Sequence, residues 1–305
     1  MRVLDFIFAL RPLVLVPAWS FFLLGFGATA GADFPAQRFL LLSAVLAAVH
    51  LVNQVADRDS DRINAKGFFL QRGIFRPRTY VVAALALLAG ALGVAFVDRA
   101  APWRLAAAAA LGLAYSVPPL RFCARPGLDV VANACGYGGL ATWIGAGDGA
   151  IAGPWAARLA ACMLAVAAVF LHTTLLDVTG DARTGKHTTG SVLGCARTRA
   201  LAAAAAVTAS LLAAFAASPL LLGACVPLAL LALAAWGAPH RVTSVVVSVG
   251  GTTLFAIAAS VQMPLFAVAL GGLVLLTRAY YARRFALAYP SLRSAAVAPP
   301  DTATR

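Results

Sequence analysis

The sequence predicts an all-α protein, a polytopic bundle of nine to ten transmembrane helices around a central apolar chamber that is capped by cytoplasmic loops. Of its 305 residues, 62% are hydrophobic and only 11% are charged, whereas about 25% of the residues of a soluble domain are charged. Apolar runs of roughly 17 to 22 residues follow one another along nearly the whole chain, and such a run can cross a hydrocarbon core. We therefore expect an integral membrane protein with no room for a separate soluble domain.

Ten apolar segments follow one another along the chain. Ala, Leu and Val dominate them and Gly recurs within them, so the helices can approach one another closely in lipid. The segments cover residues 11–29, 37–56, 80–97, 103–116, 128–146, 155–176, 199–217, 219–236, 243–260 and 263–281.

The formal charge of +13 comes from arginines that lie between the apolar segments. Their placement argues against nucleic-acid binding and signals topology. The loops after the second, fourth, sixth and eighth segments are basic and those between them are not, so the positive-inside rule places the basic loops and the N-terminus in the cytoplasm. We expect a multi-pass protein of a bacterial inner (plasma) membrane. The arginines near the C-terminus favour an even number of crossings, so ten segments fit better than nine.

The two ends of the chain and its cysteines add little chemistry. We expect one transmembrane domain over residues 1–289, followed by a small, polar and disordered tail over residues 290–305. The first apolar run lacks a small-residue cleavage site and is expected to enter the membrane uncleaved. None of the five cysteines has the spacing of a zinc site or of a disulfide framework.

A repeated acidic pattern ends two of the apolar segments. Asp57 and Asp61 are followed by Lys66, and Asp177 and Asp181 are followed by Lys186 at the same spacing; these are the only two lysines. Carboxylates four residues apart share one helix face. Two such pairs facing each other would hold Mg²⁺, which commonly binds substrate phosphates as well.

The residues beside the two pairs extend this hypothesis. Asn53 lies one turn deeper than Asp57 on the same stripe, and polar groups inside a membrane are by default candidates for a functional site. Lys66 and Lys186 could reach phosphate oxygens, since a lysine is a compact charge with three donors. The alternative for either lysine is contact with lipid headgroups.

The stretch YSVPPLRFCARPG at residues 115–127 lies between the two motifs. Arg121 is a candidate diphosphate clamp because a guanidinium can meet two oxygens at once. Arg121 and Arg125 could instead be ordinary topology-setting arginines. Tyr115 stands at the right depth to stabilise a carbocation through its ring, or else it is an interfacial anchor.

The pattern NxxxDxxxD at the end of the second segment, DxxxD at the end of the sixth and YSxPPLR between them resemble the UbiA superfamily of intramembrane prenyltransferases. The resemblance spans nearly the whole chain. It implies that Mg²⁺ and an isoprenyl diphosphate are bound by Asn53, Asp57, Asp61, Asp177 and Asp181, with Lys66, Arg121 and Lys186 as diphosphate contacts.

The sequence departs from the family at two points. Many relatives carry a lysine at the position of Cys123, so one phosphate contact is missing here or is replaced by Arg125. Family members typically have nine transmembrane helices, whereas the charge pattern favours ten, so one of the last three segments could be interfacial.

The expected reaction is transfer of an isoprenyl group to a lipophilic acceptor through an allylic carbocation. The chain contains no Glu, which favours an electron-rich acceptor that needs no strong dedicated base. Aromatic compounds, tetrapyrroles, carotenoids and glycerolipids are the acceptor classes that the resemblance leaves open. Three alternatives remain: a terpene cyclase that uses the same site without an acceptor, a cation-coupled transporter and a membrane scaffold without activity.

Overall fold

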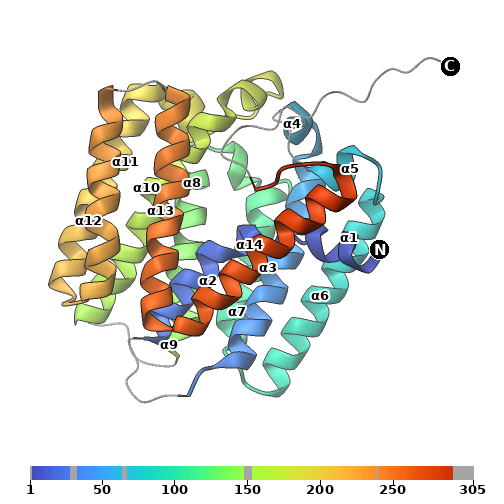
Figure 1. Cartoon of the computed structure of the whole chain (residues 1–305), viewed down its shortest axis with the longest axis horizontal. Helices are drawn as coiled ribbons and strands as arrows, with labels where there is room; N and C mark the ends of the chain where they lie inside the picture. Colours follow the sequence, from blue (N-terminus) through green and yellow to red (C-terminus); the bar gives the residue numbers. More distant parts are fainter. Residues whose placement is uncertain (1, 28–32, 64–66, 148–152, 238–239, 291–305) are drawn as a thin grey trace.

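The computed structural model describes residues 2–27, 33–63, 67–147, 153–237 and 240–290, which form a bundle of helices without any strand (Figure 1). The α-helices are α1 (Arg2–Ala9), α2 (Pro12–Phe26), α3 (Ala36–Ala56), α4 (Arg58–Ile63), α5 (Phe68–Gln71), α6 (Pro77–Val97), α7 (Pro102–Ser116), α8 (Leu128–Asn133), α9 (Ala141–Ala146), α10 (Gly153–Arg183), α11 (Thr189–Phe215), α12 (Pro219–Ala234), α13 (His240–Gln262) and α14 (Pro264–Phe285). The remaining helical pieces are η1 (Phe122–Ala124), the π-helix η2 (Ala134–Leu140) and η3 (Ala235–Gly237).

Each of the ten apolar segments predicted from the sequence coincides with helical structure. In nine of them one α-helix covers most of the segment, and the fifth is the composite of α8, η2 and α9. The multi-pass helical bundle is therefore confirmed. The short helices α4, α5 and η1 were not predicted; they lie in the polar connections.

Among the described residues, fewer helices than predicted are long and apolar enough to cross the whole membrane. Six described helices, namely α3, α6, α10, α11, α13 and α14, are long and apolar enough to cross a membrane, and α1 with α2 gives a seventh as a pair bent by 54°. Helices α2 and α7 contain 15 residues and α12 contains 16. At 1.5 Å per residue they are roughly 23 Å long, shorter than a hydrocarbon core of about 30 Å. Each begins at a proline, which fixes its first turn.

The closest helix contact joins α2 to α9. A Cβ atom added to Gly25 would lie 2.0 Å from the carbonyl oxygen of Thr142, and one added to Gly145 would lie 2.0 Å from the carbonyl oxygen of Phe22. The two backbones therefore touch directly, which is how small residues hold helices together in lipid. This contact fixes the wall of the bundle between α2 and α9.

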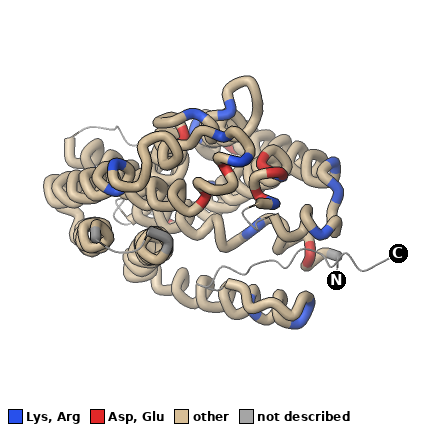
Figure 2. The backbone as a smooth tube through the Cα atoms, turned by 90° about the horizontal axis from the view of Figure 1, so that it is seen from above, with Lys and Arg blue, Asp and Glu red and all other residues tan. Residues whose placement is uncertain are grey.

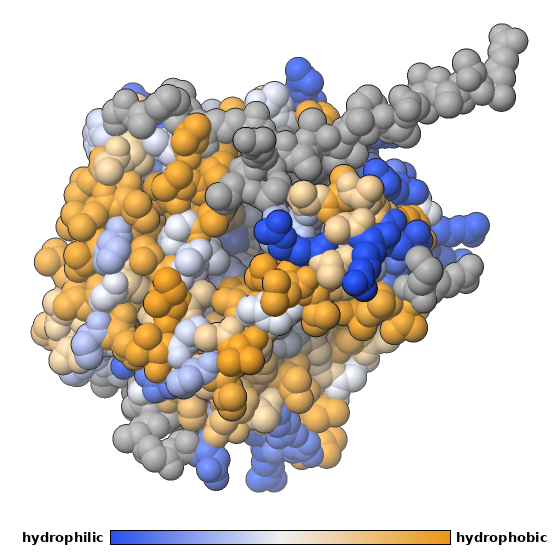
Figure 3. Space-filling view, viewed as in Figure 1, coloured by the Kyte–Doolittle hydropathy of each residue, from blue (hydrophilic) through white to orange (hydrophobic). Residues whose placement is uncertain are grey.

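The outer surface is largely apolar, and hydrophilic residues gather toward its two ends (Figure 3). Large side chains such as Val97, Trp103 and Leu265 are 72% to 81% exposed. So much exposed apolar area would be unfavourable in water. The bundle is built to be surrounded by lipid.

The first and last helices meet on one side of the bundle. The Tyr280 hydroxyl on α14 donates to Asp5 Oδ1 on α1 at 2.5 Å, and Arg284 Nε lies 3.4 Å from the same oxygen. On this side Gln54, near the end of α3, donates to the carbonyl oxygen of Ala9. The helices α1 and α14 thus meet on the side that carries the first acidic motif. The predicted tail lies outside the described residues from position 291 on.

Candidate active site

The two acidic motifs, far apart in the sequence, meet at one end of the bundle. Asp57 follows α3, Asp181 lies in the last turns of α10, and the Nζ atom of Lys186 is 3.3 Å from Asp57 Oδ2 and 3.9 Å from Asp181 Oδ1. Both carboxylates are buried, with exposed fractions of 7% and 2%. Seen from above, acidic and basic residues lie close together near the middle of this face (Figure 2). The expectation that both motifs face the same side is confirmed.

Asp57 is the centre of the cluster. Its Oδ2 atom accepts a hydrogen bond from Asn53 Nδ2 at 3.0 Å, and Arg121 Nη2 lies 3.8 Å from its Oδ1 atom. Asn53 also donates to the Ser116 hydroxyl at the end of α7. The buried Oδ1 atom has no hydrogen-bond partner, and a buried oxygen left in this state is costly unless a ligand meets it. Asp57 therefore has an oxygen available for a further ligand.

The predicted straight stripe of Asn53, Asp57 and Asp61 is wrong in one respect. Helix α3 ends at Ala56, Asp57 has the non-helical dihedrals φ −96° and ψ 15°, and Asp61 belongs to the separate helix α4. The backbone hydrogen bonds from Asp57 to Asn53 and from Asp61 to Asp57 nevertheless persist. Asn53 and Asp61 therefore lie on two separate helices, with Asp57 at the break between them.

Lys186 is set in place by a tight turn after α10. Gly185 adopts a positive φ of 66°, which favours glycine, and the Lys186 amide donates to the Asp181 carbonyl oxygen at 2.9 Å. Burial alone would lower the pKa of the Lys186 ammonium, but Asp57 and Asp181 raise this pKa above its ordinary value. The group is a fixed positive charge between the two motifs.

The outer members of the two acidic pairs are placed less tightly. Asp61 is half-buried on α4 and Asp177 is half-buried on α10, one turn before Asp181. No three acidic, histidine or cysteine side chains of the described ranges come together as a metal-binding group. Lys66 lies outside the described residues, so its expected phosphate contact stays a prediction.

The loop after α7 places its predicted residues differently. Arg121 approaches Asp57, whereas Arg125 is exposed and donates to the Pro119 carbonyl oxygen of its own loop at 2.7 Å. Cys123 is buried beside Arg121. Burial and the nearby Asp57 carboxylate raise the pKa of the Cys123 thiol to about 11, so it stays neutral and supplies no charge to this site.

Another carboxylate, that of Asp129 at the start of α8, connects this loop to the start of α11 through hydrogen bonds. It is fully buried and accepts hydrogen bonds from the backbone amide of Thr189 at 2.7 Å, from the Thr189 hydroxyl and from the backbone amide of Val130. Thr188 caps α11 through Ser191. Because Lys186 lies just before this cap, Asp129 fixes the end of the loop that presents the lysine.

Replacing Asp129 by Ala is expected to lower the free energy of unfolding by about 3 kcal/mol, since three donors lose a charged, buried acceptor. The purified variant should also bind isoprenyl diphosphate more weakly, because Lys186 loses its support. Thermal unfolding and a donor titration measure the two effects. Asp33→Ala, at an exposed position before α3, is the matched control, and equal melting temperatures for the two variants would contradict this role for Asp129.

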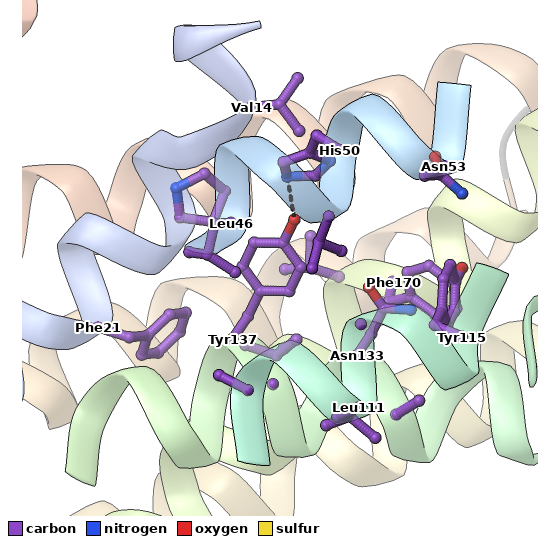
Figure 4. Close-up of a pocket in the computed structure, with 18 of the residues that line it drawn as sticks. Val14, Phe21, Leu46, His50, Asn53, Leu111, Tyr115, Asn133, Tyr137 and Phe170 are labelled. Carbon is purple, nitrogen blue, oxygen red and sulfur yellow. Dashed lines mark hydrogen bonds between the residues drawn. The ribbon is translucent and has the colours of Figure 1, made fainter. Parts of the chain in front are cut away.

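A chamber of about 360 Å³ opens directly beneath the acidic cluster. Mainly apolar side chains of α2, α3, α7, α10 and α13, together with α8 and η2, line it. It runs from Asn53 to Leu46 along α3 and from Ser116 to Ala108 along α7, which at 1.5 Å per residue is roughly 11 to 12 Å. Asn53 and Tyr115 lie toward one end and Phe21 toward the other (Figure 4). The predicted central apolar chamber is therefore present.

The chamber also contains polar residues that the sequence did not single out. Ser116 and Asn133 lie near the acidic end, and His50 and Tyr137 form a hydrogen-bonded pair farther in (Figure 4). For the His50–Tyr137 pair the sequence offers one sign, namely that His50 is a histidine inside an apolar run. Ser116 and Asn133 have no recognisable spacing to the motifs.

Comparison with known proteins agrees with this arrangement. The family model of the UbiA prenyltransferase family matches residues 14–245. No curated protein sequence matches the chain significantly.

Among solved structures, a UbiA homolog from Archaeoglobus fulgidus bound to GPP and Mg²⁺ is similar, with a TM-score of 0.71, 22% identity and coverage of 85% of this chain and 98% of that one. The same homolog bound to DMAPP and Mg²⁺ gives a TM-score of 0.65 at 22% identity, covering 83% and 98%. A digeranylgeranylglyceryl phosphate synthase gives 0.62 at 15% identity, covering 86% and 97%. These likenesses establish the fold, and the family model, which matches more than half of the sequence, establishes that the chain belongs to the UbiA prenyltransferase family.

Proposed function

We propose that this membrane prenyltransferase transfers an isoprenyl group from an isoprenyl diphosphate to a lipophilic acceptor, and that the acidic cluster binds the diphosphate together with Mg²⁺. The observation that carries the proposal is the meeting of two buried carboxylates, Asp57 and Asp181, with Lys186, next to an apolar chamber whose lining residue Asn53 donates a hydrogen bond to Asp57. Charged groups over an apolar cavity match a substrate that has an anionic head and a hydrocarbon tail.

The residues present suit Mg²⁺. Carboxylate and amide oxygens are its preferred protein ligands, and the buried Oδ1 atom of Asp57 lacks a hydrogen-bond partner. When bound, Mg²⁺ would neutralise charge on the departing diphosphate. The residues that would hold it are Asn53, Asp57, Asp61, Asp177 and Asp181.

The cations of the site would bind the remaining diphosphate oxygens. Lys186 is held beside Asp57, and Arg121, whose side chain is 42% exposed, lies at the entrance. Fixed positive charges around a leaving group stabilise the charge that develops as the allylic carbon–oxygen bond breaks. Lys66 and Arg125 are proposed as further contacts at the rim.

The chamber would receive the isoprenyl chain and the acceptor. Its apolar walls exclude water, which would otherwise capture the allylic carbocation. Tyr115 lines the end near Asn53, where an aromatic face could stabilise the cation.

Solved relatives of this fold hold GPP or DMAPP with Mg²⁺, and another is named for the synthesis of digeranylgeranylglyceryl phosphate. An aromatic compound, a tetrapyrrole, a carotenoid or a glycerolipid would suit the acceptor role, with the site facing the cytoplasm of a bacterial inner membrane.

The direct test uses the purified protein in lipid nanodiscs with labelled geranylgeranyl diphosphate, Mg²⁺ and a bacterial lipid extract. The label is expected to move into a lipid whose mass exceeds that of an extract component by one isoprenyl group, and EDTA should stop the transfer. Diphosphate release with only a cyclised hydrocarbon as product would favour the cyclase. Transfer that continues unchanged in EDTA would refute the role of Mg²⁺.

A further inference from the structure

A hydrogen-bonded pair, His50 and Tyr137, lies in the wall of the chamber away from the acidic cluster. The Nε2 atom of His50 on α3 and the hydroxyl oxygen of Tyr137 on η2 are 2.9 Å apart, and both side chains line the cavity. The pair joins two elements 87 residues apart in the sequence. An ionisable side chain at this depth is costly unless it serves a function.

The pair lies at the level that the first carbons of a bound substrate would occupy. His50 precedes Asn53 by three residues on the same helix, about 4.5 Å farther from the acidic cluster. The Tyr137 ring projects into the space between His50 and Leu111 (Figure 4). The allylic carbons next to a diphosphate held at Asn53 and Asp57 would therefore lie beside the Tyr137 hydroxyl.

An unusual stretch of backbone presents Tyr137. It lies in the π-helix η2, and π-helical turns occur frequently at functional sites. Its neighbour Gly138 packs against α10 so closely that an added Cβ atom would lie 2.6 Å from the Cys162 carbonyl oxygen. The glycine contact fixes the segment against α10 and leaves the tyrosine facing the chamber.

The proposed reaction needs a proton acceptor that the acidic cluster does not provide. An acceptor that has bonded to an allylic cation must lose a proton, and the chain has no Glu. Asp57 and Asp181 are engaged with Lys186. The ionisable side chains that line the cavity are Arg11, His50, Tyr115 and Tyr137. Of these groups the neutral imidazole is the one whose ring nitrogen can receive and pass on a proton, and a carbocation is acidic enough to give up its proton without a strong base.

We propose, resting on the function proposed above, that His50 and Tyr137 form the proton-accepting pair that follows formation of the allylic cation. The allylic carbon–oxygen bond breaks and its electron pair leaves with the diphosphate. In the transfer, a π-electron pair of the acceptor forms the new carbon–carbon bond to the allylic carbon and leaves the cationic centre on the acceptor; without an acceptor, the allylic cation itself is that centre. A carbon–hydrogen bond next to the cationic centre then breaks, and its electrons form a carbon–carbon double bond. Its proton goes to the Tyr137 oxygen as the hydroxyl proton moves to His50 Nε2. The imidazolium returns the proton to the released diphosphate.

Geranyl diphosphate without an acceptor tests this pair. With Mg²⁺ the protein is expected to release diphosphate and to form acyclic triene hydrocarbons by proton loss, beside alcohols formed by water capture. In His50→Gln and in Tyr137→Phe the ratio of hydrocarbon to alcohol should fall by on the order of a hundredfold. Diphosphate release should change little, because ionisation depends on the acidic cluster.

Two matched variants separate chemistry from packing. His172→Gln and Tyr80→Phe change a buried histidine and a buried tyrosine outside the chamber lining, and both should keep the wild-type ratio. A ratio unchanged in His50→Gln and Tyr137→Phe, or a wild-type protein that yields alcohols only, would overturn the proposal. Failure of the wild type to release diphosphate with Mg²⁺ would instead refute the proposed function, and the role of the pair would fall with it.

Discussion

Asp57→Asn is expected to reduce the rate of diphosphate release from an isoprenyl diphosphate by about a hundredfold to a thousandfold, the scale seen when one preorganised group that stabilises a developing charge is lost. Asp57 contacts Lys186, Arg121 and Asn53 at once, so the change removes the charge at the centre of the cluster. The amide has nearly the same shape, and the fold should persist. Steady-state release of diphosphate, followed with a coupled phosphate assay, measures the effect.

Asp59→Asn is the matched control for this prediction. Asp59 lies two residues away on α4, and its side chain is exposed. It carries the same charge near the same face, so it reports any general effect of lowering the local negative charge. If both variants lost activity equally, the specific role of Asp57 would be refuted.

Gly25→Val is expected to prevent assembly of the bundle or to destabilise it by more than about 3 kcal/mol. The new side chain would start 2.0 Å from the carbonyl oxygen of Thr142 on α9, and a backbone atom cannot rotate away as a side chain can. Because α2 lines the chamber, the surviving fraction should bind donor poorly. Monodispersity in size-exclusion chromatography and the melting temperature measure the outcome.

Gly90→Val provides the comparison for a glycine without neighbours. Gly90 lies on α6, and an added Cβ atom there meets nothing within 4 Å. This variant should elute and melt like the wild type. Normal assembly of Gly25→Val would show that α2 and α9 do not touch as described.

The sequence predicted those features that depend on local pattern. Apolar runs located the helices because lipid imposes their length and composition, and the spacing of Asp57 and of Asp181 identified the acidic ends. The four-residue spacing of the acidic residues could not reveal that α3 ends at Ala56. Asp57 still donates a helical backbone hydrogen bond to Asn53, although its φ and ψ angles are not helical. The α-helices α2 and α12 are also shorter than the apolar runs that predicted them.

Features that depend on partners distant in the sequence were not predictable. Asp129 looked like an ordinary residue at the edge of a segment, and only the fold brings it to Thr189, 60 residues away. The pairing of His50 with Tyr137 likewise depends on how η2 packs on α10. The side-chain partner of Arg125 was likewise not predictable, because its guanidinium donates to the Pro119 carbonyl oxygen of its own loop; its contact with the diphosphate stays a prediction.

The contact of Asp5 with Tyr280 and Arg284 means that the ends of the helical chain are held side by side. The order of the helices along the chain could therefore be changed without changing their packing. A circular permutant in which the C-terminal segment is joined to the N-terminus would keep α1 against α14. New ends would fit the short turn between α11 and α12, where Ala216, Ala217 and Ser218 separate the two helices. The order in which the helices enter the membrane would change while the walls of the chamber stayed the same.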